Sequence, residues 1–370
     1  MEGNNIQKAG NNSIQNQYTN CNFVVGITEE KVREIIKDEN KILIASYNEI
    51  ARDVAMIRSK KIEEKFVTEL VKEKLLEELK RPEILVAIRE TGEKAICTDD
   101  EKSYELLSKL LSNRIKHSNN KIIASSLKNA TEVATEITDE ALTGLTVFFL
   151  MTYYSPINAG IRQGLESLND MFKIIDLNNL PKSNIWLEQL DVLKLGRINS
   201  VGSMKELIDY YSEKLNGYVC VGIKKDSEQY KEAVEVLEKV NLTKNDLVTH
   251  ELNEEYVRLP LANCTNYQNN FFHITVDGSL LFRLSEEQHR AYEKIIGLYE
   301  RNDAILNKNK EVFAEILNQM SNLKRIRDWW DKINLSFNVT IVGLVLAYTN
   351  INNISKNFDL PKIELKNLIK

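Results

Sequence analysis

The sequence predicts a mainly α protein, a helical bundle with a short N-terminal β oligomerisation segment and a small β-hairpin insertion. Glycine and proline number only 14 and 5 in 370 residues, too few to supply the turns of a β-sandwich or barrel. Apolar residues recur instead at helical spacing through long charged stretches. The hydrophobic content of 43% is sufficient for a core, so wholesale disorder is excluded.

The first 27 residues differ in composition from the rest of the chain. They are rich in Asn and Gln, and the stretch Ser13–Val25 is β-compatible but has too little apolar surface to stay ordered alone. A polar strand of this kind becomes stable when copies from other chains pair with it. We therefore expect a self-association segment at 1–27, with a disordered tail as the alternative. The residues expected to take part are Gly10, Asn11, Asn12, Ser13, Gln15, Gln17 and Tyr18.

Residues 28–180 are expected to form a bundle of helices joined by short loops. Thr28 is suited to cap the first helix, because two acidic residues follow it in the first turn. No Gly or Pro interrupts residues 32–80, which predicts either one long helix or two helices joined near Asp38–Lys41. Asp99–Asp100 and Thr138 are suited to cap later helices of the bundle.

Two stretches without charged residues, Ala141–Ile161 and Ile333–Ser355, reach the length of a membrane span. Pro156 interrupts the first, and polar side chains are spread along the second, which is unfavourable in hydrocarbon. We therefore expect the helices within 141–154 and 337–351 to be buried in the core. Conditional membrane insertion is the alternative.

The second half, residues 181–370, is expected to be mixed but mostly helical. Ser203–Glu206 matches a capping box that would open a short helix. Tyr218–Ile223 is predicted to be a short strand. A β-hairpin is predicted near 271–284, because two apolar runs flank the turn signal Asp277–Gly278.

Motifs that would indicate catalysis, a metal or a cofactor are missing from the sequence. His250–Glu251 opens H-E-L-N-E, which lacks the second His of the zinc-peptidase helix. The acidic triplet Asp99–Glu101 could hold Mg²⁺, but helix capping explains it better. The net charge of -5 removes a global electrostatic argument for nucleic-acid binding. The four cysteines show no framework spacing, which favours idle thiols in a reducing cytosol.

One short segment near the C-terminus combines cations and aromatic residues, as single-strand nucleic-acid surfaces do. A tryptophan pair beside a buried helix is also explained by packing, and the sequence favours packing over an interaction hot spot. The residues of this possible interaction surface are Lys324, Arg325, Arg327, Trp329 and Trp330.

The segment Gly10–Gln17, followed by Gly26–Thr28 at the start of a helix, resembles the N-terminus of a bacterial family of unassigned activity. Three later stretches are similar to the same family: Arg89–Arg114, Trp186–Gly202 and Asn338–Asn350. The N-terminal segment of that family is associated with mobile-element and anti-phage contexts. The resemblance thus implies a bacterial cytoplasmic protein with a role in defence, and it supplies no catalytic residues.

We therefore expect a non-enzymatic oligomeric sensor or scaffold in bacterial anti-phage defence, without a cofactor. Its partners would be copies of itself, joined through the N-terminal segment, and a phage or host protein. Two alternatives come from other classes of protein. One is a membrane-perturbing effector that releases an uncharged helix, and the other is a nuclease or nucleotide-processing enzyme whose site forms between subunits.

Overall fold

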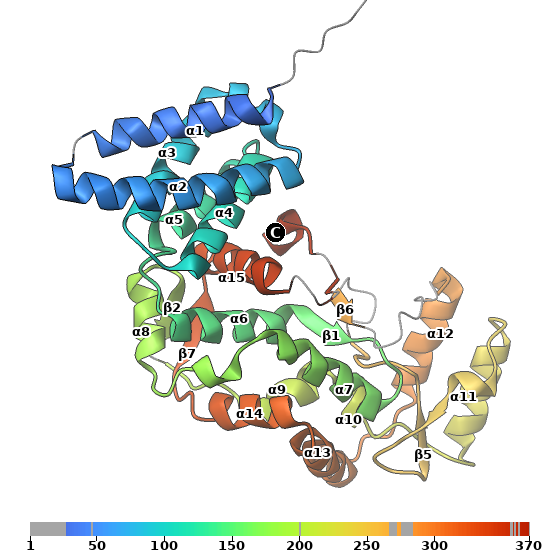
Figure 1. The fold of residues 1–370 in the computed structure, drawn as a ribbon. Helices are drawn as coiled ribbons and strands as arrows, with labels where there is room; N and C mark the ends of the chain where they lie inside the picture. Colours follow the sequence, from blue (N-terminus) through green and yellow to red (C-terminus); the bar gives the residue numbers. More distant parts are fainter. Residues whose placement is uncertain are drawn as a thin grey trace, which may run out of the picture.

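The computed structural model describes residues 27–45, 47–199, 201–265, 272–274, 284–355, 358, 360–361 and 363–369. Its described part is dominated by α-helices, with a few short strands, so the predicted mainly α fold class is confirmed (Figure 1). The expected self-association segment at 1–27 lies, apart from Ile27, outside the described residues. The division of the chain at residue 180 stays a prediction.

The helices of the first half follow one another closely. They are α1 (Glu29–Ile44), α2 (Glu49–Lys72), η1 (Leu76–Lys80), α3 (Pro82–Ile96), α4 (Glu101–Lys116), α5 (Lys121–Val133), α6 (Asp139–Tyr153), α7 (Ile161–Met171), η2 (Phe172–Ile174) and η3 (Leu177–Asn179). In the second half they are α8 (Ile185–Val192), α9 (Leu207–Lys214), α10 (Asn216–Val219), α11 (Glu228–Glu238), η4 (Lys244–Asp246), α12 (Glu286–Gly297), α13 (Asp303–Asn318), α14 (Ser321–Trp330), α15 (Ile341–Ile354) and α16 (Leu365–Leu368).

The strands are short and, among the described residues, form three separate sheets. They are β1 (Tyr154–Pro156), β2 (Gly196–Asn199), β3 (Ile223–Lys224), β4 (Val248–Thr249), β5 (Tyr256–Arg258), β6 (Phe272–Ile274) and β7 (Ser336–Val339). Strand β1 pairs in parallel with β6, β2 pairs antiparallel with β7, and β5 lies between β3 and β4 in an antiparallel sheet. These pairings join segments that are far apart in the sequence.

Local capping chemistry sets the helix boundaries of the first bundle. The hydroxyl of Thr28 accepts from the backbone N–H of Lys31, and Asp100 and Thr138 cap α4 and α6, as predicted. The break in the long charged stretch lies between the end of α1 and the start of α2, and not near 38–41. It lies there because Oδ1 of Asn48 caps α2 by accepting the N–H of Ala51 at 3.0 Å.

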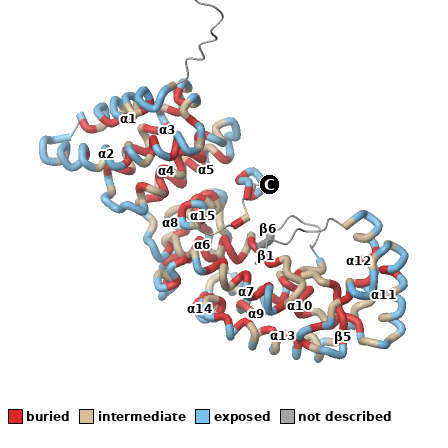
Figure 2. Tube along the Cα trace, turned by 45° about the vertical axis from the view of Figure 1, so that its right-hand side comes forward, coloured by how far each residue is buried: buried red, intermediate tan, exposed pale blue. Residues whose placement is uncertain are grey.

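Helix α15 lies between α4 and α5 on one side and α6 on the other (Figures 1 and 2). Its N-terminus is held by the backbone N–H of Thr340, which donates to the carbonyl of Leu195 at 3.0 Å. Helices α6 and α15 contain the two uncharged stretches, and their buried apolar side chains belong to one hydrophobic core. In the part of the chain that the structure describes, no helix has the length and apolarity needed to cross a membrane.

A second, smaller core lies beside the main one. It is formed by α11, α12 and the β3–β5–β4 sheet, with Leu237, Leu259 and Ile295 at its centre. In Figure 1 these elements extend from the side of the molecule opposite α1 and α2. The remaining helices share the main core, which contains residues from α1 through α16.

Two local predictions for the second half are wrong. The capping box at Ser203–Glu206 does not open a helix, because α9 begins at Leu207 and its N-terminal N–H donates to Asp331 at 2.7 Å. Tyr218–Ile223 is not one strand, because Asn216–Val219 is helical and only Ile223 begins a strand. The helical turn buries Tyr218, whose hydroxyl donates to the carbonyl of Asn158 at 2.7 Å.

The predicted hairpin near 271–284 lies largely outside the described residues and stays a prediction. The first strand expected for the hairpin is present as β6. In the structure β6 pairs with β1.

Candidate ligand-binding site

A cavity of about 440 Å³ opens where α4, α6 and α15 meet the turn that contains η2 and η3. Small-molecule sites in proteins usually measure about 300–1,000 Å³. Four elements from distant parts of the sequence therefore form one cavity whose size suits a small-molecule ligand.

Two asparagines of α15 line the inner part of this cavity. Nδ2 of Asn350 donates to the hydroxyl of Thr146 on α6 at 3.0 Å. Asn353 is one turn further along α15 and only 7% exposed, and its Oδ1 has no hydrogen-bond partner among the described residues. An unpaired buried carbonyl oxygen costs about 1–3 kcal/mol. An incoming N–H or O–H donor would remove this cost.

The mouth of the cavity is acidic. Its charged lining residues are Asp100, Lys102, Glu105, Asp139 and Asp176, so four carboxylates face one ammonium group. Lys102 forms an ion pair with Asp139 at 3.1 Å, and Glu105 is 3.4 Å from Lys65. The other two carboxylates cap helices: Asp100 accepts from Ser103, and Asp176 accepts from Asn178.

The electrostatic state of the mouth follows from these contacts. Burial acts to raise the pKa of Asp100, but the hydrogen bonds from Ser103 outweigh burial and leave this pKa below its ordinary value. The hydrogen bond to Asp139 raises the pKa of Lys102. Both groups are therefore charged at neutral pH, and the surplus of negative charge persists.

Part of the lining is apolar. It is formed by Leu106 of α4, Leu142 of α6, Ile175 and Ile354, together with Ile137 and Ile174. A ligand in this cavity would therefore meet carboxylates, an apolar surface and the amide side chains of α15.

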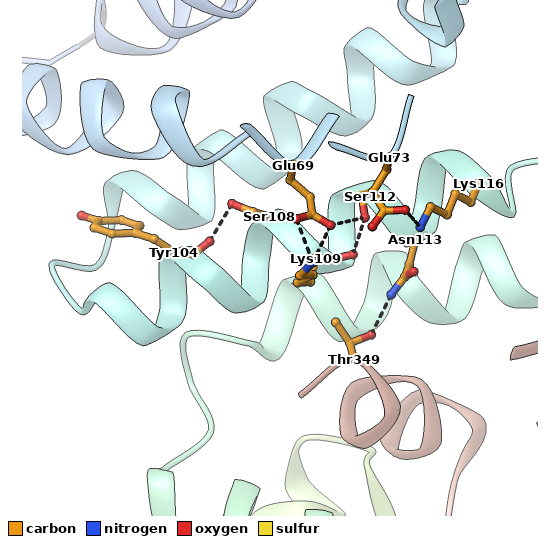
Figure 3. Close-up of polar contacts among 9 residues, drawn as sticks. All are labelled: Glu69, Glu73, Tyr104, Ser108, Lys109, Ser112, Asn113, Lys116 and Thr349. Carbon is orange, nitrogen blue, oxygen red and sulfur yellow. Dashed lines mark hydrogen bonds and ion pairs between the residues drawn. The ribbon is translucent and has the colours of Figure 1, made fainter. Parts of the chain in front are cut away.

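Behind the cavity, a polar network joins α2, α4 and α15 (Figure 3). Nζ of Lys109 donates to both carboxylate oxygens of Glu69, at 2.7 and 2.8 Å. Nδ2 of Asn113 donates to the hydroxyl of Thr349 at 3.2 Å. A second cavity of about 400 Å³ borders Glu69 and Lys109, and Asn353 also lines it. Asn353 thus lies between the ligand cavity and this network.

A salt bridge at the edge of the same network keeps α2 close to α4. The carboxylate of Glu73 accepts from Nζ of Lys116 at 2.5 Å. Burial acts to raise the pKa of Glu73, but the hydrogen bond from Lys116 outweighs burial, so this pKa lies below its ordinary value.

The predicted surface of cations and tryptophans is only partly exposed. Trp329 and Trp330 are buried, and Trp330 stacks on Phe148 with ring centroids 5.8 Å apart. Both tryptophans therefore belong to the core, because α14 packs its apolar face inward. The packing interpretation of the pair is the one that agrees with the structure.

The cations of this segment are already engaged by neighbours. Lys324 pairs with Asp328 at 2.6 Å, and Arg327 lies 3.3 Å from Asp331. Arg325 donates to the side chain of Asn178 at 3.0 Å. A groove of about 610 Å³ beside Arg325 is bordered by the edge of Trp329 and by Lys332, so any interaction here would use this groove and not two exposed rings.

The other sequence candidates have structural roles. His250 is fully buried: its Nε2 lies 2.7 Å from the carbonyl of Cys220, and its Nδ1 accepts the N–H of Leu252. Asp100 caps α4, as the dipole argument predicted. Within the described ranges, no group of three or more His, Cys, Asp or Glu residues is placed to hold a metal ion. The predicted self-association residues, Gly10 to Tyr18, lie outside these ranges.

The sequence reasoning missed Asn353. Its spacing of three from Asn350 near the end of a mostly apolar helix was visible, but asparagines at that spacing also occur on exposed faces. The information that separates the two cases is the packing of α4 and α6 against α15.

The model of a protein family described as ":-like" matches residues 26–363. The chain belongs to this family. The match spans all of the elements that form the cavity, so the cavity lies within the part of the chain that the family shares. The N-terminal segment at 10–17 lies before the match. No curated protein and no solved structure matches the chain.

Proposed function

We propose that the protein is a non-enzymatic oligomeric sensor or scaffold that acts in the bacterial cytoplasm, in defence against phage. In this proposal the N-terminal segment joins copies of the chain, and the cavity between α4, α6 and α15 receives a small ligand. Its partners are further copies of itself and a phage or host protein that binds the assembly.

One observation supports the sensor role most directly. Asn353 lines the cavity, and its Oδ1 has no hydrogen-bond partner among the described residues although the side chain is buried. Cores normally pair such groups or replace them with apolar ones, because an orphaned acceptor destabilises the fold. A bound ligand that donates a hydrogen bond accounts for retaining asparagine at this position.

The position of α15 would let a ligand affect distant parts of the chain. This helix packs against α4 and α5 as well as α6, and its N-terminus is fixed to Leu195. A ligand that pairs with Asn353 would favour one arrangement of α15 relative to these helices. A ligand can shift an equilibrium only by its difference in affinity for the two states, and Asn353 would supply that difference.

The first test concerns assembly. The molar mass of the full chain should be a multiple of 42.6 kDa, and a chain without residues 1–26 should have a lower mass. Multi-angle light scattering after gel filtration measures both masses. A full-length control with residues 1–26 in shuffled order separates the effect of composition from that of the motif. Equal masses for the intact and shortened chains would refute self-association through this segment.

The second test concerns defence and sensing. Bacteria that produce the protein should show reduced plating of at least some phages, and Asn353→Leu should abolish this protection without changing the oligomeric mass. Asn352→Leu, at the exposed neighbouring position on α15, is the matched control and should retain protection. Unchanged plating with the wild-type protein contradicts the defence role. Full protection by Asn353→Leu contradicts the sensor role of the cavity.

A further inference from the structure

The chemistry of the cavity limits which ligands can bind there. Four carboxylates and one ammonium group surround the mouth, so the charges favour a cation over an anion. The lining carboxylates come from three elements, α4, α6 and the turn before η3, so the charge surrounds the opening. A cation entering the cavity would therefore be attracted from several sides.

The ion pairs at the mouth leave part of this charge uncompensated. Lys102 pairs with Asp139, and Lys65 lies near Glu105. Asp100 and Asp176 accept hydrogen bonds from backbone N–H groups of their own turns, which stabilise a carboxylate without adding a net positive charge. Lys65 lies closer to Glu101, at 2.7 Å, and the charge of Lys102 acts on Asp100 and Asp176 as well as on Asp139. The carboxylates of the lining still outnumber its one ammonium group, so a surplus of negative charge remains for a ligand to neutralise.

A second and independent feature selects for hydrogen-bond donors. Oδ1 of Asn353 can only accept, and the side chain is more than nine-tenths buried where it lines the cavity. A quaternary ammonium group would be attracted by the carboxylates but could not donate to this oxygen. A primary or secondary ammonium group is attracted by the same charge and can also donate a hydrogen bond.

The apolar part of the lining selects for an apolar body. It includes Leu106, Leu142 and Ile354, where a fully hydrated polyol would lose water without compensation. We infer, on the basis of the sensing function proposed above, that this cavity binds a protonated organic amine with a compact apolar body.

The probe for this inference is 2-phenylethylamine, and its affinity for the full chain is measured by isothermal titration calorimetry. Three analogues of similar shape isolate the individual contributions: 2-phenylethanol lacks the charge, phenylacetate reverses it, and trimethyl(2-phenylethyl)ammonium keeps the charge without an N–H donor. We expect 2-phenylethylamine to bind at least about tenfold more tightly than each analogue, which corresponds to one charge-assisted hydrogen bond.

Two variants assign the binding to the cavity. Asn353→Leu should weaken 2-phenylethylamine about tenfold and leave the quaternary analogue unchanged, because only the primary amine uses the amide oxygen. Asp176→Asn should weaken both cations, since it removes charge while keeping the cap on η3. Asp303→Asn, in the first turn of α13 and outside the cavity, is the matched control and should change neither affinity.

The outcomes separate this inference from the proposed function. Equal or tighter binding of phenylacetate or 2-phenylethanol, no binding of 2-phenylethylamine, or unchanged binding by Asn353→Leu overturns the amine assignment. Binding with the expected order of affinities supports it, whether or not the oligomeric mass responds. If the amine binds as expected but neither the mass nor the protection against phage depends on Asn353, the sensor proposal fails while the ligand class stands.

Discussion

Asn113 on α4 donates a hydrogen bond of 3.2 Å to the hydroxyl of Thr349 on α15, across 236 positions of sequence (Figure 3). Both side chains are buried, and Thr349 in turn donates to the carbonyl of Val345 at 2.7 Å. Asn353 lies one turn beyond Thr349 on the same helix. The contact therefore fixes the first bundle to the helix whose next turn lines the cavity.

The first prediction concerns this contact. Asn113→Ala and Thr349→Val should each lower the free energy of unfolding by about 1–3 kcal/mol. Asn113→Ala removes one of the two hydrogen bonds of the Thr349 hydroxyl, and Thr349→Val leaves the buried amide of Asn113 without this acceptor. The double variant should lose less than the sum of the single losses, by about 1 kcal/mol. Urea unfolding of the four proteins measures this coupling. Strictly additive losses would show that the two side chains do not stabilise each other.

The second prediction concerns the ion pair between Glu69 and Lys109, whose side chains are only 11% and 14% exposed. Glu69→Met should destabilise the protein by about 3 kcal/mol, because it leaves the ammonium group buried without a counter-charge. Adding Lys109→Met should recover much of the lost stability, because the unpaired ammonium group is then absent. Thermal unfolding of the single and double variants compares the two effects.

An exposed pair on α1 provides the control for this experiment. Lys31 and Glu34 are 2.7 Å apart, yet their side chains are 57% and 59% exposed. Glu34→Met should change stability by less than about 1 kcal/mol, because solvent screens surface pairs. If Glu69→Met lowered the stability as little as Glu34→Met does, burial would not be what makes the Glu69–Lys109 pair important for stability.

The helices of the first bundle could be predicted well because their signals are local. Thr28, Asp100 and Thr138 lie within three residues of the N–H groups that they cap, so a short stretch of sequence contains the whole interaction. The start of α9 shows the limit of such rules. Its terminal N–H, on Leu207, pairs with Asp331, which is 124 positions away. The capping box at Ser203–Glu206 was locally plausible, and the distant contact replaced it.

The cavity could not be predicted for a related reason. Asp100, Asp139 and Asp176 each occupy a position typical of helix caps or first turns, so each has a sufficient local explanation. Only the packing of α4, α6 and α15 places them around one opening beside Asn353. From the sequence, Trp330 could belong either to the core or to a surface. Only the packed structure shows that it is buried.

The third prediction follows from the buried imidazole of His250. Burial, together with the charge of Arg258, lowers the pKa of His250 from its ordinary value of 6.5 to about 4, although the contact with Cys220 opposes this change. Between these values the unfolded chain binds a proton that the folded chain does not. The free energy of unfolding should therefore fall by about 3 kcal/mol as the pH drops from 6.5 to 4.

The variant His250→Gln isolates this effect. It removes the titrating group, so its stability should depend less steeply on pH over the same range, although the lost contact to Leu252 lowers its stability at neutral pH. Urea unfolding at several pH values measures the slopes of the wild type and of His250→Gln. Parallel curves for the wild type and His250→Gln would refute the assignment.

The last prediction concerns the contact between the start of α15 and Leu195. A Cβ at Gly343 would lie 2.1 Å from the carbonyl oxygen of Leu195 and 2.8 Å from Cγ1 of Val339. Helix propensity favours Gly343→Ala by about 1 kcal/mol, but a clash with backbone should outweigh it and destabilise the protein by about 2–3 kcal/mol. Gly297→Ala, in α12 with nothing within 4 Å of the added Cβ, should be neutral or stabilising. Thermal unfolding measures both variants, and a stabilised Gly343→Ala would mean that α15 can move away from Leu195 at little cost.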